Sequence, residues 1–360
     1  MIRAAIAKQF PAGEESAGFQ LEVQFEAGPG VTVLYGPSGS GKTLTLDAIA
    51  GFVIPDAGRI MLGERILFDA GADVQIPPQK RTCGYVFQNY ALFPHMTVRE
   101  NLAFAANELP RLERHRRIAE LLERFKLTDL AARWPRELSG GQKQRASIAR
   151  ALIAEPGALL LDEPGRGLDA SLRNDLYTLI NEMKASLKIP MLLVTHDPEE
   201  CFALADKVLI YSGGKIIHRG TPLELLRNPG SEAAARLLGD FNLYEAEVLA
   251  LDPARQTSRV RLLGQELTGP HLRGCFKGDR VTLCARPEEL RIAPNPGQNR
   301  IRVDTVRVLE RSQAVRADFG DQLIVDVPRD VWRERPENLW VELPAVSLRQ
   351  LRAPDAGALH

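Results

Sequence analysis

Glycine, lysine and threonine are spaced between residues 36 and 43 in a way that suits phosphate binding. The segment reads G-x-x-x-x-G-K-T, follows the apolar run Val31–Tyr35 and precedes the helix-forming stretch Leu44–Ala50. Its glycines let backbone N–H groups turn towards phosphate oxygens, and the positive end of the following helix adds to the attraction. Lys42 would reach the β- and γ-phosphates, and the Thr43 hydroxyl suits Mg²⁺. We therefore expect a nucleoside triphosphate to bind at Gly36, Pro37, Ser38, Gly39, Ser40, Gly41, Lys42 and Thr43.

Two further apolar runs end in side chains that can handle protons and cations. Ala158–Leu161 leads into Asp162 and Glu163, and Met191–Val194 leads to His196. Asp162 fits a role beside Mg²⁺ through coordinated water, and Glu163 fits the base or orienting group for an attacking water. Ligands of open parallel sheets sit at the carboxyl ends of the strands. We therefore expect the three segments to converge on one nucleotide, with His196 at the γ-phosphate.

A fourth element begins at Ser139 and continues through Gly140, Gly141 and Gln142 into a helical stretch. Ser139 is a natural N-cap, and the glycines leave the first N–H groups of the helix uncovered. Taken alone, the segment is consistent with an ordinary capped helix. Beside the glycine-rich segment it predicts a second phosphate contact.

The elements that must position these residues fall into two regions. A chain of 360 residues that is 44% hydrophobic and 26% charged exceeds the roughly 250–300 residues that one core supports, so we expect two domains. The first two-thirds alternate short apolar strands with helical stretches, a pattern typical of a parallel α/β sheet. The last third carries short alternating runs, which favour a small all-β domain of barrel or sandwich type. The predicted strands of this domain are Glu247–Leu251, Arg259–Leu263, Arg280–Ala285, Ile301–Leu309, Ala314–Phe319, Leu323–Val327 and Leu339–Leu343.

Charge and hydropathy exclude several classes of protein. Forty-six basic residues balance forty-six acidic ones, so no global field attracts nucleic acid, and we expect no nucleic-acid partner. The longest apolar runs fall far short of the ~20 residues that cross a bilayer, and the N-terminal residues do not resemble a secretory signal, which predicts a cytosolic protein. The four cysteines show no metal-binding or disulfide spacing, and we expect reduced thiols.

Together the motifs resemble those of the nucleotide-binding subunit of ABC transporters, over about residues 1–240. The resemblance implies a P-loop NTPase fold of ABC type with a helical subdomain at about 89–155, followed by an OB-like β-barrel domain at 245–352. It implies a head-to-tail homodimer in which each ATP, with Mg²⁺, lies between the glycine-rich segment of one chain and Ser139–Gln142 of the other. It also implies that Gln88 contacts Mg²⁺ and water, and that Asp169 belongs to the nucleotide site.

Two positions depart from the family pattern or leave it open. Arg166 stands where the family carries a small side chain near the dimer partner, so a guanidinium there brings the usual coupling of the two sites into question. The aromatic that stacks on adenine is either Phe10 or Phe19, and we favour Phe19.

A membrane partner and a transport direction follow from a weaker likeness. Gln88–Leu102 resembles the segment that importer ATPases present to permease subunits, with Leu92, Phe93 and Met96 as its apolar residues; core packing is the rival interpretation. The β domain resembles the accessory domain of importers, which implies a peripheral place on the cytoplasmic side of the inner membrane and an indirect partnership with a periplasmic or surface solute-binding protein.

The residues leading to the glycine-rich segment resemble those of molybdate and sulfate importers, and iron, polyamine or sugar import is the alternative. Rival classes are a soluble ABC ATPase acting on ribosomes or DNA, a P-loop kinase, and a regulatory protein that keeps only ATP-dependent dimerisation.

Overall fold

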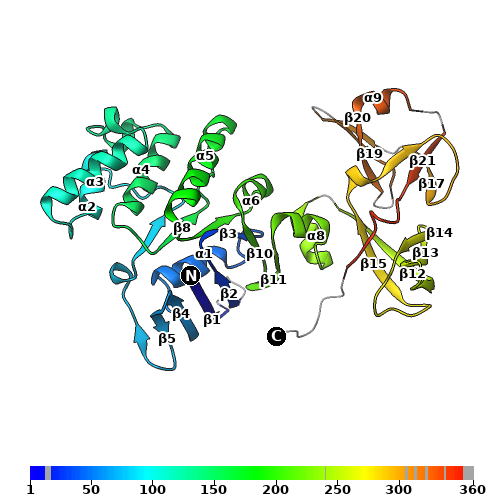
Figure 1. Ribbon diagram of the computed structural model, residues 1–360, viewed down its shortest axis with the longest axis horizontal. Helices are drawn as coiled ribbons and strands as arrows, with labels where there is room; N and C mark the ends of the chain where they lie inside the picture. Colours follow the sequence, from blue (N-terminus) through cyan, green and yellow to red (C-terminus); the bar gives the residue numbers. More distant parts are fainter. Residues whose placement is uncertain are drawn as a thin grey trace. The chain divides into compact units, whose positions relative to one another are not determined.

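The computed structural model divides the chain into two compact units, residues 1–223 and 224–360 (Figure 1). It describes residues 1–12, 18–239, 241–304, 307–311, 314–320, 323–335 and 338–351. Residues 240 and 352, at which the two predicted domains end, lie outside the described residues. Within these ranges no helix is both long and apolar enough to pass through a bilayer.

One mixed sheet organises the described part of the first unit, in the order β6-β5-β4-β1-β2-β11-β10-β3-β9-β8-β7. The five strands from β10 to β7 pair in parallel, which confirms the α/β prediction. An antiparallel part adjoins them, because β1 pairs antiparallel with both β2 and β4. The strands are β1 (Ile2–Phe10), β2 (Phe19–Ala27), β3 (Gly30–Tyr35), β4 (Ala57–Leu62), β5 (Arg65–Asp69), β6 (Val74–Gln75), β7 (Cys83–Val86), β8 (Ala158–Asp162), β9 (Pro190–Thr195), β10 (Lys207–Ser212) and β11 (Lys215–Gly220).

The parallel strands are short runs of buried apolar residues, as expected for strands covered on both faces. Every residue of β8 and β9 is buried. Helix α1 packs on β8 and β9, while α5 and α6 pack on β3. The helices of this unit are α1 (Lys42–Ala50), α2 (Val98–Ala105), α3 (Arg111–Arg124), α4 (Gly140–Leu152), α5 (Ala170–Leu187), α6 (Pro198–Leu204) and α7 (Pro222–Arg227), which crosses into the second unit.

Register aligns the ends of the central strands. Tyr35 pairs with Thr195 across β3 and β9, and Asp162 pairs with Val194 across β8 and β9. Parallel strands in register end at the same edge of the sheet, so the loops that follow β3, β8 and β9 start side by side. Helices α2, α3 and α4 lie in the segment between β7 and β8 and contact one another, α2 packing on the other two (Figure 1).

The second unit confirms the prediction of an all-β region, here with short helices added. The strand pairs among its described residues are all antiparallel, and these strands form sheets in the orders β14-β13-β12-β15-β22, β16-β21-β17 and β18-β19-β20. The elements are α8 (Glu232–Leu238), β12 (Asn242–Asp252), β13 (Thr257–Leu262), β14 (Gln265–Pro270), β15 (Arg280–Ala285), β16 (Arg291–Ala293), β17 (Arg300–Val303), β18 (Arg307–Glu310), β19 (Ala314–Asp318), β20 (Ile324–Pro328), α9 (Arg329–Arg333), β21 (Leu339–Glu342) and β22 (Arg349–Leu351).

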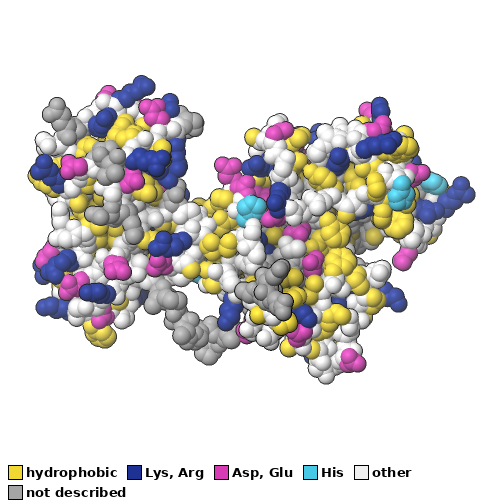
Figure 2. Space-filling view, turned by 180° about the vertical axis from the view of Figure 1, so that it is seen from behind, with side chains coloured by type: hydrophobic (Ala, Val, Ile, Leu, Met, Phe, Trp, Pro, Cys, Tyr) yellow, Lys and Arg dark blue, Asp and Glu magenta, His cyan; other side chains and the backbone are white. Residues whose placement is uncertain are grey.

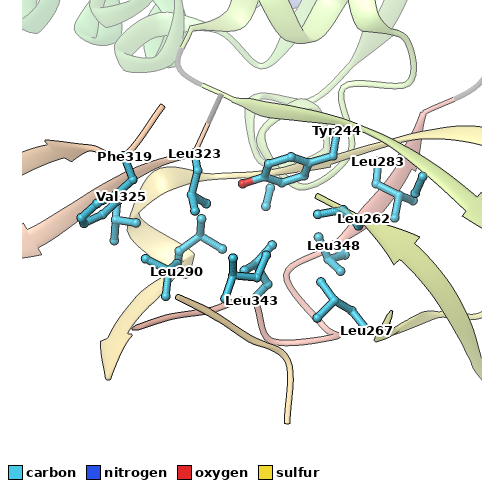
Figure 3. Packing of buried hydrophobic residues seen from close by; sticks show 14 of the residues in the cluster. Tyr244, Leu262, Leu267, Leu283, Leu290, Phe319, Leu323, Val325, Leu343 and Leu348 are labelled. Carbon is cyan, nitrogen blue, oxygen red and sulfur yellow. The ribbon is translucent and has the colours of Figure 1, made fainter. Parts of the chain in front are cut away.

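One predicted strand of this unit is wrong. The run Ile301–Leu309 is not continuous: its first residues belong to β17 and its last to β18, and these strands lie in different sheets. The alternation changes phase in this run, because polar Asp304 and Thr305 are adjacent and the apolar positions move from odd to even numbers. Treating the run as one strand overlooks that signal. Figure 3 shows the shared core, where Tyr244 from β12 points among leucines that include Leu290 and Leu323.

An ion pair ties the turn after β15 to the last strand. Two nitrogens of Arg349 each donate to one oxygen of Glu289 at 2.5 Å, and the side chains are 19% and 29% exposed. Burial raises the pKa of Glu289, but hydrogen bonding to Arg349 and its charge outweigh burial and hold the pKa below its ordinary value of 4.5. The pair therefore contributes its full stability above pH 4.5 and loses it as the pH falls through the lower pKa of the folded state.

Replacing Glu289 with glutamine should lower the free energy of unfolding at pH 7 by about 1–3 kcal/mol, because Arg349 loses its charged hydrogen-bond partner. The deficit should shrink as the pH falls well below 4.5, since the wild-type carboxyl is then protonated as well. Urea titration of the full chain, followed by the fluorescence of Trp332 and Trp340 in a Trp134→Phe background, measures both effects.

Glu247→Gln serves as the matched control, because its pair with Arg261 is about half exposed on both sides. That variant should lose less than about 0.5 kcal/mol. Equal losses in the Glu247 and Glu289 variants would contradict the assignment.

Candidate functional site

The glycine-rich segment between β3 and α1 forms a tight turn with an uncapped helix behind it. Gly41, the N-cap residue of α1, has a φ of 99°, and a Cβ there would lie 2.7 Å from Leu21 Cδ1. Gly39 also has a positive φ, 77°. Only glycine adopts such backbone freely. No side chain caps the first turn of α1, so its N–H groups can bind an anion at the positive end of the helix.

Lys42 is buried inside this turn, with 5% of its surface exposed. Its Nζ donates to the carbonyl oxygens of Gly36 at 2.8 Å and Pro37 at 2.7 Å. Burial lowers the pKa of Lys42, and the carboxylates of Glu163 and Asp162 oppose that change. Loop carbonyls and two carboxylates therefore stabilise a cation at the wall of a cavity.

The cavity has a volume of about 370 Å³ and a lining of two chemical kinds. Ser38–Leu44 and Glu163 contribute polar and charged groups, and Phe10 and Phe19 contribute aromatic surface. Strands β1 and β2 pair these two phenylalanines directly, and their ring centroids are 6.5 Å apart. The volume falls in the usual range for small-molecule sites, and the lining combines charged with aromatic groups. Both aromatic candidates for adenine stacking thus line the same cavity.

Thr43 and Asp162 meet beside the turn. Thr43 Oγ1 donates to Asp162 Oδ1 at 3.0 Å, and Asp162 is only 6% exposed. Burial raises the pKa of Asp162, the Thr43 hydrogen bond lowers it, and nearby Asp47 and Glu163 raise it further. A hydroxyl and a crowded carboxylate are hard oxygen donors of the type that Mg²⁺ prefers.

The described residues contain no group of three or more His, Cys, Asp or Glu side chains that could hold a metal. Magnesium usually takes only one or two carboxylates and fills its other positions with water and substrate oxygens. The Thr43 and Asp162 pair therefore fits Mg²⁺ and does not fit a metal that needs a protein cage.

Glu163 sits at the cavity wall with both carboxylate oxygens in contact. His196 Nδ1 lies 2.9 Å from Oε1, and Arg166 Nη1 lies 2.7 Å from Oε2. Burial raises the pKa of Glu163, but the hydrogen bonds and charges of Arg166 and His196 outweigh it, so the pKa lies below its usual value. The residue also has a φ of 46°, a conformation that non-glycine residues seldom adopt and that often marks functional sites.

Gln88 joins this cluster through Arg166. With its amide oriented to satisfy both groups, Gln88 Oε1 accepts from Arg166 Nε at 3.2 Å and from Nη1 at 2.5 Å. The family pattern predicts that residue 166 lies near a dimer partner, and these contacts within the same chain are not predicted. The position of Arg166 three residues after Glu163, in a glycine-containing turn, is a signal for its contact with Glu163 but not for its contact with Gln88.

Two predicted site elements lie apart from the cavity lining. Ser139 and Gln142 form a reciprocal capping box: Ser139 Oγ accepts from Gln142 N at 3.3 Å, and Gln142 Oε1 accepts from Ser139 N at 2.9 Å. The predicted N-cap at Ser139 is therefore present and satisfies the N–H of Gln142, while Gly140 and Gly141 open the helix. Asp169 is the N-cap of α5 and accepts from Leu172 N at 2.9 Å.

The segment Gln88–Leu102 forms a surface with half-buried apolar side chains. Leu92, Phe93 and Met96 are all partly exposed, and Phe93 packs edge-on against Phe104 at 4.7 Å between ring centroids. Buried Asn101, a residue not singled out from the sequence, fixes the loop by donating to the carbonyl oxygens of residues 93, 96 and 97.

On the face drawn in Figure 2, basic and acidic side chains are interspersed.

Comparison with known proteins gives consistent matches. The family model described as "ABC transporter" matches residues 20–166. The molybdenum import ATP-binding protein ModC of Paramagnetospirillum magneticum is 34% identical over 95% of this chain and 92% of its own. The sulfate/thiosulfate import ATP-binding protein CysA 2 of Agrobacterium fabrum is 39% identical over 86% of this chain and 87% of its own.

Relatives named for spermidine and putrescine import are 38% to 40% identical. Among solved structures, the ATP-binding cassette MJ0796, a dimer in a post-hydrolysis state bound to ADP and phosphate, matches with a TM-score of 0.54 and 26% identity. That match covers 62% of this chain and 99% of the cassette.

Proposed function

The chain belongs to the ATP-binding proteins of ABC importers, and from this premise we propose that two copies of it bind and hydrolyse ATP to drive uptake of an inorganic oxyanion. As a member of this family the chain is an ATPase. The observation that carries the proposed mechanism is the meeting of Lys42, the Thr43–Asp162 pair and Glu163 around one cavity with a partly aromatic lining.

ATP binds with its phosphates on the turn Gly36–Thr43 and its adenine against Phe19. The backbone N–H groups of the turn and Lys42 meet the negative oxygens, while Phe10 remains the alternative stacking partner because it lines the same cavity. Thr43, Asp162 and Gln88 are the residues that would hold Mg²⁺. When bound, Mg²⁺ supplies charge that neutralises phosphate oxygens.

Glu163 is the general base in the proposed reaction. It accepts a proton from water, whose oxygen forms a bond to the γ-phosphorus while the bond from that phosphorus to the bridging oxygen breaks. ADP keeps the electron pair, and inorganic phosphate is the second product. Negative charge that spreads over the γ-phosphoryl oxygens meets Lys42, His196 and the N–H groups of the turn. Gln88 orients the water.

A second copy of the chain completes the site. The capped start of α4 lies apart from the cavity lining of its own chain, so Ser139–Gln142 acts on the nucleotide bound by the other copy. Asp169, at the start of α5, belongs to the same contact between the two copies. The dimeric cassette that resembles this chain supports such an arrangement.

The surface of Gln88–Leu102 receives a helix of the permease. Its partly exposed apolar side chains suit a helix-in-groove contact, and Asn101 holds the loop in shape for it. A peripheral place on the cytoplasmic side of the inner membrane follows from this role. The solute-binding protein, periplasmic or at the cell surface, acts only through the permease.

The cargo is an oxyanion such as molybdate or sulfate. The alignment with the molybdenum import protein extends over 95% of this chain and therefore includes the second unit, whereas that with the Nitrosospira multiformis polyamine import protein covers 81%. Polyamine import is the second candidate, favoured by the higher identity of those relatives.

Replacing Glu163 with glutamine should slow ATP turnover by at least about a hundredfold, because the amide cannot accept the proton from water. The variant should still bind ATP, since the turn and Lys42 are unchanged. Steady-state phosphate release and calorimetry with ATP measure the two effects. Turnover equal to wild type would refute the assignment of the base.

Replacing Lys42 with alanine should weaken ATP binding itself, because the phosphates lose their buried cation. Calorimetric titration with ATP and Mg²⁺ measures the loss. The control is Lys215→Ala, because the Lys215 side chain on β11 is 64% exposed. The affinity of this variant for ATP should equal that of wild type. Unchanged affinity in the Lys42 variant would mean that the phosphates bind elsewhere.

Deleting the gene from its source cells should abolish high-affinity uptake of labelled molybdate or sulfate and leave spermidine and putrescine uptake intact. The wild-type gene should restore uptake, and the Glu163→Gln form should not. Loss of polyamine uptake alone would transfer the assignment to the second candidate.

A further inference from the structure

Arg166 lies on the turn that follows β8, and the backbone of that turn directs it back to Glu163. Arg166 N donates to Glu163 O at 3.2 Å, which closes the turn. Gly167 has a φ of 75°, and a Cβ at Gly165 would lie 2.6 Å from Glu200 Oε1, so glycine is needed on both sides of Arg166. The two glycines thus present one arginine to the catalytic wall.

The guanidinium of Arg166 occupies a carboxylate oxygen of Glu163 that a general base needs in order to accept a proton. Arg166 Nη1 donates to Glu163 Oε2 at 2.7 Å, and His196 already occupies the other carboxylate oxygen at 2.9 Å. Since Glu163 is only 12% exposed, few other directions remain from which water can reach its oxygens. The carboxylate is therefore held in an ion pair while Arg166 stays in place.

The same guanidinium contacts Gln88, which begins the segment leading to the helices α2 to α4. Gln88 Oε1 accepts from Arg166 Nε and Nη1 at 3.2 and 2.5 Å. Arg166 thus connects the residue proposed to activate water with the residue proposed to orient it. A displacement of Gln88 removes one of the two partners that hold the guanidinium.

The bridge can open at low cost. The side chain of Arg166 is 57% exposed, so water replaces the hydrogen bonds that its guanidinium loses. Glu163 is only 12% exposed, but it keeps His196 as a hydrogen-bond partner when Arg166 leaves. Losing the bridge should therefore alter the reaction without unfolding the chain.

We propose that Arg166 is a positioning residue that restrains the base: while it bridges Glu163 and Gln88, it limits proton transfer to Glu163, and hydrolysis accelerates when the bridge opens. The proposal rests on the proposed function of Glu163. It assigns to Arg166 a role in its own chain, at a position where the family carries a small residue.

Replacing Arg166 with alanine should raise kcat of the full-length chain by about three- to tenfold, which corresponds to about 0.7–1.4 kcal/mol and lies within the net contribution of one typical hydrogen bond. ATP affinity and KM should stay within about twofold of wild type, because Lys42 and the turn still bind the phosphates. The kcat of Arg166→Lys should fall between those of wild type and Arg166→Ala, since a lysine is a point charge that cannot bridge both Glu163 and Gln88. Phosphate release, calorimetry with ATP and the melting temperature are the measurements.

Arg116→Ala is the matched control. Arg116 is 63% exposed and makes an ion pair at 2.7 Å with Glu120 on α3. Neither residue belongs to the cavity lining. Its kcat should equal that of wild type. The double variant Arg166→Ala/Glu163→Gln should be as slow as Glu163→Gln alone, which shows that the acceleration acts through Glu163.

The outcomes separate the two proposals. If wild type and Glu163→Gln hydrolyse ATP equally fast, the base assignment fails, and the restraint fails with it. If they differ but Arg166→Ala is no faster than wild type at an unchanged melting temperature, the restraint alone is overturned. A lower kcat in Arg166→Ala would mean that Arg166 holds Glu163 in its productive position instead.

Discussion

The parallel pairing of β3, β9 and β8 is the constraint on which the proposed nucleotide site depends. Tyr35 opposes Thr195 and Asp162 opposes Val194, so the glycine-rich turn, Glu163 and His196 all start at one edge of the sheet. Slipping a strand by one residue would exchange its two buried faces, which makes the register costly to change. Buried apolar strands therefore fix the separation of polar groups that lie in three distant parts of the chain.

Opposite charges make that convergence tolerable. A buried lysine or carboxylate alone would be driven towards its neutral form, but Lys42 lies near Asp162 and Glu163, and Glu163 is paired with Arg166 and His196. The carboxylates are not equivalent: burial dominates at Asp162 and raises its pKa, whereas the contacts with Arg166 and His196 lower the pKa of Glu163. The different surroundings of the two carboxyl groups thus fit Asp162 for a place beside a cation and keep Glu163 ionised.

The sequence predicts the convergence of these residues because their motifs are contiguous and follow buried strands. The residues of Gly36–Thr43, with Asp162 and Glu163, do lie together, and composition and alternation also predict the α/β and all-β regions. What it misses has two causes. The contact between Gln88 and Arg166 joins distant residues, and nothing near either of them predicts it. Asn101 and the run Ile301–Leu309 carry local signals that are easily overlooked: the partners of Asn101 lie just before it in the chain, and the alternation of the run changes phase at Asp304-Thr305.

The contact between Gln88 and Arg166 also bears on how movement and chemistry can be linked. Gln88 opens the segment that carries the surface proposed for the permease, and Arg166 connects it to Glu163 over two hydrogen-bonding steps. Coupling needs an element with two arrangements that both sites influence. An exposed arginine between two glycines meets that requirement more readily than a buried side chain would, because either of its partners can be exchanged for water. A small residue at this position would leave Glu163 and Gln88 without this side-chain link, and the attacking water would be the remaining group that both residues are proposed to contact.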